Sequence, residues 1–373
     1  MENIPRVVLT GGVSGGHTFP LIAVARALRS QLPEGIELLF VGSHGRFEDD
    51  AMGRENIPVK YVLTGKWRRY FSFKNFTDLF RLPLGFAQAL WHLFWFMPDV
   101  VFSKGGSASV SIVLAAWLYR IPVLIHDSDA VAGRANRFLA RFARRIAIAY
   151  PSARKFFPEL KTALTGNPVR TEILSGNVAR AIKRYGLSSE KKTLLVIGGS
   201  QGAYALNEAL LQILPALLES GIQVIHQTGE KNYALIVEAV EAYGLKIGES
   251  GYVPQAFFSA EELADVLMMA SLVVSRAGAG SIAELAALKK AAILIPLASA
   301  ANDEQRMNAY DVAELGGALV LEEPNLGEHI LLEKIKGLLL DDALRESMGE
   351  KLHAFYHADA ADVLASGLRE MMS

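Results

Sequence analysis

The feature that most constrains the fold is a unit of strand, glycine-rich loop and helix that occurs twice. Near the start, an apolar strand at 6–10 leads into Gly11-Gly12-Val13-Ser14-Gly15-Gly16-His17 and then into a helical run. In the second half, a strand at 193–197 leads into Gly198-Gly199-Ser200-Gln201-Gly202 and another helical run. A strand that is apolar throughout is typical of a parallel sheet covered on both faces. The repeat predicts two Rossmann-like α/β domains facing across a cleft, with both loops at the carboxyl ends of strands.

Short β-branched runs alternate with helical stretches along the chain. We expect strands at 6–10, 37–41, 99–103, 122–126 and 145–149, and then at 193–197, 223–227, 272–275 and 292–296. The 373 residues exceed what one ordinary hydrophobic core holds. Gly166, Asn167 and Pro168 mark a turn or hinge. We therefore predict a first domain over 1–165 and a second over 166–354.

The bulk composition excludes several classes of protein. A formal net charge of -1 gives no general attraction to nucleic acid, so we expect no nucleic-acid partner. The lack of cysteine excludes a disulfide framework, a thiolate nucleophile and a cysteine-ligated metal. We expect no secretory signal before the first strand, because no basic region with an apolar stretch is seen there. The most apolar stretch, 86–97, is shorter than the roughly 20 residues of a membrane-spanning helix. We expect a soluble or peripheral protein.

Two loops of the second half are candidates for binding an anion. Glycines in the 198–202 loop let the backbone turn tightly, and the following helix start offers free N–H groups and a helix dipole. After the strand at 272–275, Gly278-Ala279-Gly280-Ser281 opens a second such helix, with Glu284 in its first turns. A carboxylate there can accept two hydroxyls of a sugar diol such as a ribose, or simply complement the helix dipole. We predict phosphate binding, with tight turns that bind nothing as the alternative.

Amide and carboxylate side chains gather after the next predicted strand. Asp303, Gln305 and Asn308 lie near a helix start, and planar polar groups of this kind recognise sugar hydroxyls. Helix capping by Asn302 or Asp303 explains part of the same pattern. We interpret Gln305 and Asn308 as candidate sugar-binding residues.

Titratable groups of the first half are candidates for acid–base chemistry. His17 closes the first glycine-rich loop, where a histidine is a candidate general base near neutral pH. A later strand ends in His126-Asp127-Ser128-Asp129. Helix starts and turns account for some such residues. His17, Asp127 and Asp129 therefore stand as alternative candidates for the base.

Two short motifs point to other chemistry. Both glycine-rich loops match the nucleophile-elbow string of serine hydrolases, with Ser14 and Ser200 at its centre, but two copies cannot both hold the nucleophile. Residues 278–283 fit a variant of the dinucleotide fingerprint, whereas residues 11–16 do not, which weakens the case for a dehydrogenase. The sequence contains no Walker-type, HExxH or paired Cys/His motif. We expect neither a metal nor a cofactor.

An aromatic and basic segment is the candidate for contact with a membrane. Trp67, Phe71, Phe73, Phe76 and Phe80 lie among lysines and arginines. Aromatic rings at headgroup depth, with cations on anionic lipid, are typical of a membrane interface. The alternative is a loop packed on its own domain, although a stretch this aromatic is unfavourable to expose in a soluble monomer. We predict a lipid or partner surface.

These motifs, in this order, resemble the MurG family of bacterial N-acetylglucosaminyltransferases, which belong to the GT-B glycosyltransferases. The resemblance covers about residues 6–323 and is carried by Gly15-Gly16-His17 with Pro20, by 166–170, by 198–203, by 278–284 and by the 303–309 segment. It implies an inverting transfer of N-acetylglucosamine (GlcNAc) from UDP-GlcNAc to the 4-hydroxyl of an undecaprenyl-diphosphate-linked N-acetylmuramyl peptide (lipid I). The product, lipid II, serves peptidoglycan synthesis.

The resemblance also implies roles on the donor side. Glu284 takes the ribose hydroxyls, Arg170 lies near the nucleotide, and Gln305 and Asn308 hold the sugar. The donor loops contribute further substrate-binding residues, namely Gly199, Ser200, Gln201, Gly202, Gly280 and Ser281. Helix starts and loop N–H groups stabilise the leaving UDP without an obligatory metal.

On the acceptor side, the resemblance places the lipid diphosphate at the first loop. Ser14, Gly15 and Gly16 bind it, and His17 lies near the reacting groups. The 67–80 segment corresponds to the membrane-docking region, which implies a peripheral protein on the cytoplasmic face of the bacterial plasma membrane. The last helix, near 355–373, packs back on the first domain.

Departures from the family pattern leave alternatives open. Where the family usually has His-Glu-x-Asn, this chain has Asp127 and Asp129, and Glu304 stands where a histidine is usual. The segment 254–260 looks like an insertion near the uracil-binding loop. Another lipid acceptor such as diacylglycerol is therefore an alternative. So are a UDP-sugar-binding subunit without catalysis and a UDP-sugar epimerase.

Overall fold

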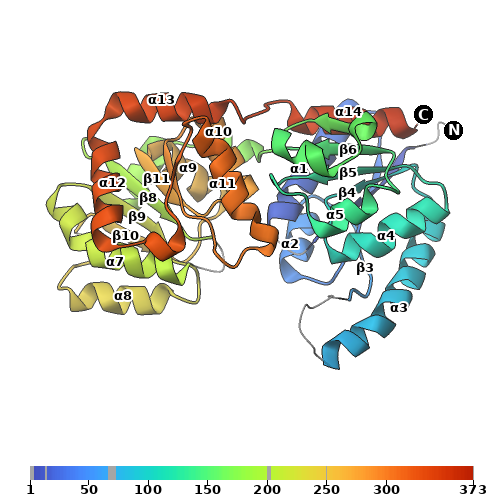
Figure 1. Cartoon of the computed structure of the whole chain (residues 1–373), viewed down its shortest axis with the longest axis horizontal. Coiled ribbons are helices and arrows are strands. Elements are labelled where there is room, and N and C mark those ends of the chain that lie inside the picture. Colours follow the sequence, from blue (N-terminus) through green and yellow to red (C-terminus); the bar gives the residue numbers. More distant parts are fainter. Residues whose placement is uncertain (1–3, 13–14, 66–72, 200–202, 249, 373) are drawn as a thin grey trace. The chain divides into compact units, whose positions relative to one another are not determined.

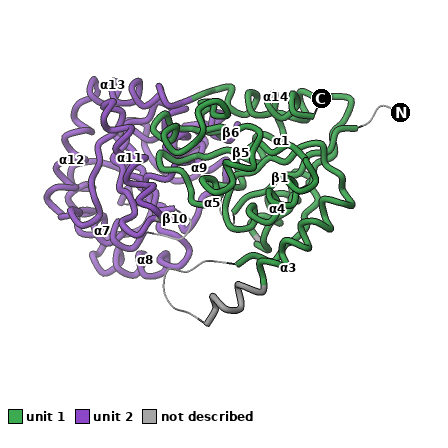
Figure 2. Tube along the Cα trace, turned by 45° about the vertical axis from the view of Figure 1, so that its right-hand side comes forward, with its two compact units in different colours: residues 1–169, 357–373 green, residues 170–356 purple. Residues whose placement is uncertain are grey.

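The chain forms two compact units, each built on one parallel sheet (Figure 1). The computed structural model describes residues 4–12, 15–65, 73–199, 203–248 and 250–372, with the backbone alone at 46, 73–80 and 301. Unit 1 comprises Met1–Val169 with His357–Ser373, and unit 2 comprises Arg170–Tyr356 (Figure 2). The expected α/β class, with two Rossmann-like sheets, is confirmed.

Unit 1 contains a seven-stranded parallel sheet in the order β3-β2-β1-β4-β5-β6-β7. Its strands are β1 (Arg6–Thr10), β2 (Glu37–Gly42), β3 (Val59–Tyr61), β4 (Val100–Ser103), β5 (Val123–Asp127), β6 (Arg145–Ile148) and β7 (Thr162–Leu164). Its α-helices are α1 (Gly15–Gln31), α2 (Arg46–Arg54), α3 (Phe73–Phe96), α4 (Ser107–Leu118), α5 (Arg134–Leu139) and α14 (Ala360–Met372). The 3-10 helices η1 (Pro151–Phe156) and η2 (Glu159–Lys161) precede β7.

Helix α14 completes the core of unit 1 although it is last in the sequence. Leu364 and Leu368 are one helical turn apart and are buried in the same apolar cluster as Leu28 of α1 and Phe40 of β2. The α1 residue Gln31 holds both ends of the contact, because its Nε2 donates to the Asp362 carbonyl and its Oε1 accepts from Ser366 Oγ. A chain cut before α14 would expose the part of this apolar cluster that α14 covers.

Unit 2 contains a six-stranded parallel sheet in the order β10-β9-β8-β11-β12-β13. Its strands are β8 (Thr193–Ile197), β9 (Gln223–Gln227), β10 (Tyr252–Gln255), β11 (Leu272–Ser275), β12 (Ala292–Leu294) and β13 (Leu319–Val320). Its α-helices are α6 (Val178–Tyr185), α7 (Tyr204–Glu219), α8 (Tyr233–Ala242), α9 (Ala260–Met269), α10 (Ala279–Ala287), α11 (Glu304–Glu314), α12 (Glu328–Leu340) and α13 (Asp342–His353). Short 3-10 helices are η3 (Thr171–Ser175), η4 (Ala301–Asp303) and η5 (Glu323–Asn325).

The strands that sequence reasoning missed are the four at the sheet edges. β3 and β7 flank the first sheet, and β10 and β13 flank the second. Edge strands are short and need no continuous apolar run, since one side stays open. The segment 254–260, which the sequence suggests is an insertion, begins inside β10, where Pro254 and Gln255 pair with His226 and Gln227. The insertion itself stays a prediction.

Candidate functional sites

In unit 1 the strand order reverses between β1 and β4. Parallel α/β sheets bind ligands outside the carboxyl ends of strands beside such a switch point. The loops after these two strands come together there, because a Cβ placed on Gly106 would lie 2.8 Å from the Gly12 Cα. Gly106 has φ +91°, a conformation that favours glycine. Gly15 and Gly16 open α1 beside this loop pair and contribute first-turn N–H groups. Ser14 lies outside the described residues.

His17, in the first turn of α1, lies against the same loops. Its Nδ1 is 3.2 Å from the carbonyl oxygen of Lys104 and must donate, since a carbonyl only accepts. Nε2 is then the unprotonated nitrogen, and it would lie 3.2 Å from a Cβ on Gly12. Burial, and then the Lys104 charge, lower the pKa of His17 to about 4. The imidazole is therefore neutral at neutral pH and has a lone pair on Nε2.

Asp127, the last residue of β5, organises the loop that follows it. Its Oδ1 accepts from the Asp129 N–H at 3.2 Å, and its Oδ2 accepts from the Gly133 N–H at 3.0 Å and from Asn136 Nδ2 at 2.9 Å. Burial raises the pKa of Asp127, while these hydrogen bonds and the charge of Lys104 oppose the shift. Both oxygens are occupied by the protein itself, which favours His17 over Asp127 as the proton acceptor.

Lys104 is a residue of this site that sequence reasoning missed. It follows β4 directly, its side chain is buried, and its Nζ contacts His126 Nδ1 at 2.6 Å and Ser128 Oγ. A lysine in a short loop gives no sign of burial by itself. The available signal was the pair Gly105-Gly106, which repeats after β4 the glycine pairs of the other loops.

In unit 2 the strand order reverses between β8 and β11. Helix α10 follows β11, begins at Ala279 and has Gly278 as its N-cap, so Gly280 and Ser281 lie in its first turn. A Cβ placed on Gly199 or on Gly280 meets no atom of the described residues within 4 Å, so these residues leave space open beside both loops. Ser200, Gln201 and Gly202 lie outside the described residues. The described part is a helix start with free N–H groups beside open space, which suits an anion.

Arg170 and Glu284 come together in unit 2. Arg170 donates from Nε at 2.8 Å and from NH2 at 2.5 Å, both to Glu284 Oε1. Each side chain is 14% exposed. Burial raises the pKa of Glu284, and the Arg170 charge and hydrogen bond oppose this shift. Within the described part of the chain, Glu284 Oε2 has no hydrogen-bond partner, so it remains available to a ligand hydroxyl.

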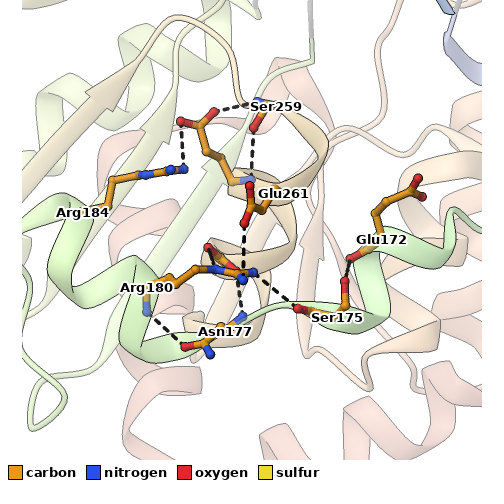
Figure 3. A network of polar contacts seen from close by, with 9 residues as sticks. Glu172, Ser175, Asn177, Arg180, Arg184, Ser259 and Glu261 are labelled. Carbon is orange, nitrogen blue, oxygen red and sulfur yellow. Dashed lines mark hydrogen bonds and ion pairs between the residues drawn. The ribbon is translucent and has the colours of Figure 1, made fainter. Parts of the chain in front are cut away.

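The segment after Arg170 is fixed on α9 by a polar network (Figure 3). Asp265 accepts from the Asn177 N–H at 2.7 Å and from Arg180 at 2.7 and 2.9 Å. Gly176 allows close packing, because a Cβ there would lie 2.2 Å from the Ala264 oxygen. The hydrogen bonds from Arg180 are the main reason that the pKa of Asp265 is lowered. A rigid connection to α9 limits where Arg170 can lie.

Gln305 and Asn308, both on α11, hold neighbouring loops. Gln305 Oε1 accepts from the Leu297 N–H at 3.1 Å, which leaves its Nε2 without a partner among the described residues. Asn308 is fully buried, and its Nδ2 donates to the Ala277 oxygen at 3.3 Å, in the loop before α10. Asn308 thus supports the loop between β11 and α10, whereas Gln305 can still donate to a ligand.

The loop between β12 and η4, which Gln305 contacts at Leu297, is also held by Glu323. Arg276 NH2 donates to Glu323 Oε1 at 2.6 Å, and Glu323 Oε2 accepts from the Ala298 N–H at 3.2 Å. Next to this loop, Asn302 and Asp303 have φ of 54° and 60°. Two successive non-glycine residues in the left-handed region are strained, and such strain is concentrated at functional sites.

The predicted membrane residues fall largely outside what the structure describes. Trp67 and Phe71 lie outside the described residues, and Phe73, Phe76 and Phe80 belong to α3 with only their backbone described. Further along α3, Trp91, Phe94 and Trp95 are 62%, 59% and 66% exposed. Their spacing of three and four residues puts them on one helix face. No helix in the described ranges is both long and apolar enough to cross a membrane.

Comparison with known proteins agrees with this geometry. Residues 7–148 match the glycosyltransferase family 28 N-terminal domain, and residues 193–364 match the glycosyltransferase family 28 C-terminal domain. The chain is 37% identical over 334 residues to the "UDP-N-acetylglucosamine--N-acetylmuramyl-(pentapeptide) pyrophosphoryl-undecaprenol N-acetylglucosamine transferase" of Clostridium perfringens, which covers 89% of this chain and 90% of that protein. The protein of the same name from Legionella pneumophila is 35% identical over 368 residues, with coverage of 98% and 97%.

Solved structures show the same architecture. Acinetobacter baumannii MurG has a TM-score of 0.75 at 25% identity, covering 98% of this chain and 99% of that one. The UDP-GlcNAc 2-epimerase of Neisseria meningitidis has a TM-score of 0.71 at 11% identity, covering 98% and 100%, and shares the fold alone. Both family 28 domains and the relatives over nearly the whole length lead to one assignment: the chain belongs to glycosyltransferase family 28 and, within it, to the family of MurG N-acetylglucosamine transferases.

Proposed function

We propose that this protein transfers GlcNAc from UDP-GlcNAc to the 4-hydroxyl of lipid I, with inversion at the anomeric carbon, and so forms lipid II for peptidoglycan. The observation that carries the proposal is the Arg170–Glu284 pair beside the α10 N-terminus, since it places an oriented carboxylate next to an anion site. A nucleoside diphosphate presents this combination of a hydroxylated ring and two phosphates.

The donor binds to unit 2 through groups at the ends of β8, β11 and β12. Glu284 accepts the ribose hydroxyls through Oε2, and Arg170 orients the carboxylate and opposes the rise in its pKa that burial causes. The first-turn N–H groups of Gly280 and Ser281, together with Gly199 and the loop of Ser200, Gln201 and Gly202, bind the diphosphate. Gln305 donates from Nε2 to the GlcNAc hydroxyls, and Asn308 fixes the loop before α10. The leaving UDP gains charge during transfer, and the α10 dipole stabilises it.

The acceptor binds to unit 1 at the ends of β1, β4 and β5. Its diphosphate contacts the first turn of α1, through Gly15, Gly16 and the neighbouring Ser14. His17 removes the proton of the 4-hydroxyl through Nε2. With a pKa near 4 the free imidazole is a weak base. The anionic diphosphate beside it favours the imidazolium and raises that pKa when the acceptor is bound.

The acceptor's lipid tail implies that unit 1 touches a membrane. The exposed Trp91, Phe94 and Trp95 of α3 extend the predicted aromatic segment, and α3 packs against α4, which ends near the exposed Trp117. Arg141 lies over the Phe138 ring close by, at 5.5 Å. Aromatic rings with cations are typical of binding to anionic lipid. We propose peripheral association with the cytoplasmic face of the bacterial plasma membrane.

The first experiment measures donor and acceptor kinetics with a short-chain lipid I analogue for the wild type, Glu284→Ala and His17→Ala. Glu284→Ala raises the donor KM with a small change in kcat, because it removes binding shared by ground and transition states. His17→Ala lowers kcat by about a hundredfold, as expected for loss of a general base. UDP-GlcNAc binding without turnover on any acceptor would instead indicate a binding subunit.

A further inference from the structure

The side chain of Lys104 lies at the centre of the unit 1 site and has no role in the transfer as described so far. It is 3% exposed and follows β4, next to the loop pair formed with Gly12. The backbone continues through Gly105 and Gly106 at φ +80° and +91°. A buried ammonium is costly unless its hydrogen bonds and charge are matched.

The hydrogen bonds of the Lys104 side chain connect the end of β5 to the turn at 166–167. Nζ donates to His126 Nδ1 at 2.6 Å, so His126 carries its proton on Nε2 and donates it to the Gly166 oxygen at 2.9 Å. Nζ also contacts Ser128 Oγ, which donates to Asn167 Oδ1 at 3.1 Å. One ammonium therefore holds two side chains against the 166–167 turn.

Its charge is matched by carboxylates of the same site. Burial lowers the pKa of Lys104 to about 8, while Asp127 and Asp129 raise it. The other titratable groups facing it are His126 from β5 and His17 from α1, both of whose pKa values are lowered by burial and by the Lys104 charge. An acidic pair at a site for a diphosphate repels the ligand unless a cation compensates it.

We propose that Lys104 is a positioning residue of the acceptor site and that its charge is coupled to Asp127 and Asp129, which flank the Ser128 that its Nζ contacts. Its ammonium offsets the added carboxylate at 129 and keeps His126 and Ser128 in place. The inference rests on the proposed function, in which this edge of unit 1 takes a diphosphate-linked acceptor. It also explains how the site accommodates an aspartate where the family usually has an asparagine.

The coupling to Asp129 is tested by a double-mutant cycle on ligand binding. The wild type, Lys104→Met, Asp129→Asn and the double variant are compared by the Kd of a short-chain lipid I analogue and of inorganic pyrophosphate. Lys104→Met raises the Kd of both ligands about tenfold or more. The rise in Kd in the double variant is at least about threefold smaller than the product of the rises in the two single variants. UDP-GlcNAc binding stays unchanged. Losses that simply multiply overturn the coupling.

Two further variants separate positioning from general loss of structure. Lys104→Arg keeps the charge and retains most of the binding. Lys290→Met removes a partly buried lysine of unit 2 whose pKa burial also lowers, and which donates to the Met268 and Ala270 carbonyls. This change leaves acceptor binding unchanged. Thermal unfolding of every variant shows whether it is folded. An equal loss of acceptor binding in Lys290→Met would mean that the effect of Lys104→Met is not specific.

The pH dependence of kcat/KM for the acceptor distinguishes this role of Lys104 from a purely structural one, which would not change it. Lys104 is charged below its pKa, so kcat/KM for the acceptor falls as pH rises through about 8 in the wild type. In Asp129→Asn the midpoint of this decline moves to lower pH, because the variant lacks a carboxylate that raises the pKa of Lys104. In Lys104→Arg the decline disappears from this range. An unchanged decline in Lys104→Arg contradicts the proposal.

The hydrogen-bond chain is tested directly by ¹H–¹⁵N spectra of histidine-labelled protein, which has eight histidines. The wild type shows neutral His126 protonated on Nε2, and Lys104→Met shifts its Nδ1 resonance. If His126 is protonated on Nδ1, or is charged, the proposal is wrong, and this result does not depend on whether the protein transfers GlcNAc. If pyrophosphate binding depends on Lys104 but the protein does not turn over lipid I, this inference holds and the proposed function is wrong.

Discussion

Arg170 donates two hydrogen bonds to a single oxygen of Glu284, at 2.8 and 2.5 Å, although the two residues are 114 positions apart in the sequence. The arrangement leaves the second carboxylate oxygen without a partner in the described part of unit 2. An arginine that binds a carboxylate on one oxygen orients it and favours its ionised form. Glu284 is therefore prepared to accept hydroxyl hydrogen bonds before the donor arrives.

The first prediction concerns this pair. Arg170→Ala raises the donor KM about tenfold, and Glu284→Ala raises it by a similar factor, because each change disorders the same ribose contact. The double variant is only slightly worse than either single one, since coupled residues are not additive. Donor kinetics at saturating acceptor check this. Independent, multiplying effects would show that Arg170 contacts the donor separately.

The centre of each sheet could be predicted from sequence, and its edges could not. Strands β1 and β8 stand out because each contains an unbroken apolar run, at 7–9 and 194–197, whereas β3 and β13 are short and only partly buried. Every predicted central strand is present, with ends that agree within about two residues, the usual spread between methods of assignment.

Site residues that lie in or beside a sequence motif could be predicted, whereas residues that only the fold brings into the site could not. His17 and Glu284 stand next to glycine-rich loops and were found from them. Lys104 was missed because its burial arises from the meeting of the loops after β1, β4 and β5. The support that Asn308 gives to Ala277 depends on α11 lying next to the loop between β11 and α10, which no local pattern contains.

The second prediction concerns the close approach of the loops in unit 1. Gly106→Ala costs about 1–3 kcal/mol in backbone strain alone, and its Cβ would meet the Gly12 Cα at 2.8 Å. We expect a lower Tm and loss of acceptor binding. Gly53→Ala is the matched control, because a Cβ there meets nothing within 4 Å and the residue lies in α2. That change leaves Tm equal or slightly higher, and a similar loss in both variants would contradict the argument.

The third prediction concerns stability at acid pH. His226 donates from Nε2 to Asn207 Oδ1 and accepts from the Tyr252 hydroxyl, and burial lowers its pKa to about 3. The unfolded chain protonates this histidine near pH 6.5 while the folded chain does not, so stability falls as pH drops below about 6.5. One such group accounts for about 2 kcal/mol between pH 7 and 5.

Denaturant unfolding of the wild type and His226→Phe at the two pH values measures this contribution. The variant is less stable at pH 7, because it leaves Asn207 and Tyr252 without their partner, but it loses less stability on acidification. An equal loss on acidification in both proteins would show that His226 is protonated in the folded state.

The fourth prediction concerns the aromatic face of α3. Trp91→Ser with Trp95→Ser reduces sedimentation with vesicles that contain anionic lipid, because exposed aromatic area and surface charge both contribute to binding. UDP-GlcNAc binding by unit 2 is unaffected. The exposed Tyr243 of unit 2 is the matched control, and Tyr243→Ser leaves sedimentation unchanged. Equal binding of wild type and variant to the vesicles would place the membrane contact elsewhere.

The central claim is transfer of GlcNAc to a lipid-diphosphate acceptor, and one measurement tests it most directly. Purified protein is given UDP-GlcNAc labelled in the sugar, together with a lipid I analogue, with diacylglycerol or with no acceptor. The account predicts a labelled, β-linked disaccharide product with lipid I alone. Label on diacylglycerol but not on lipid I, or conversion of the UDP-sugar without any acceptor, would contradict it.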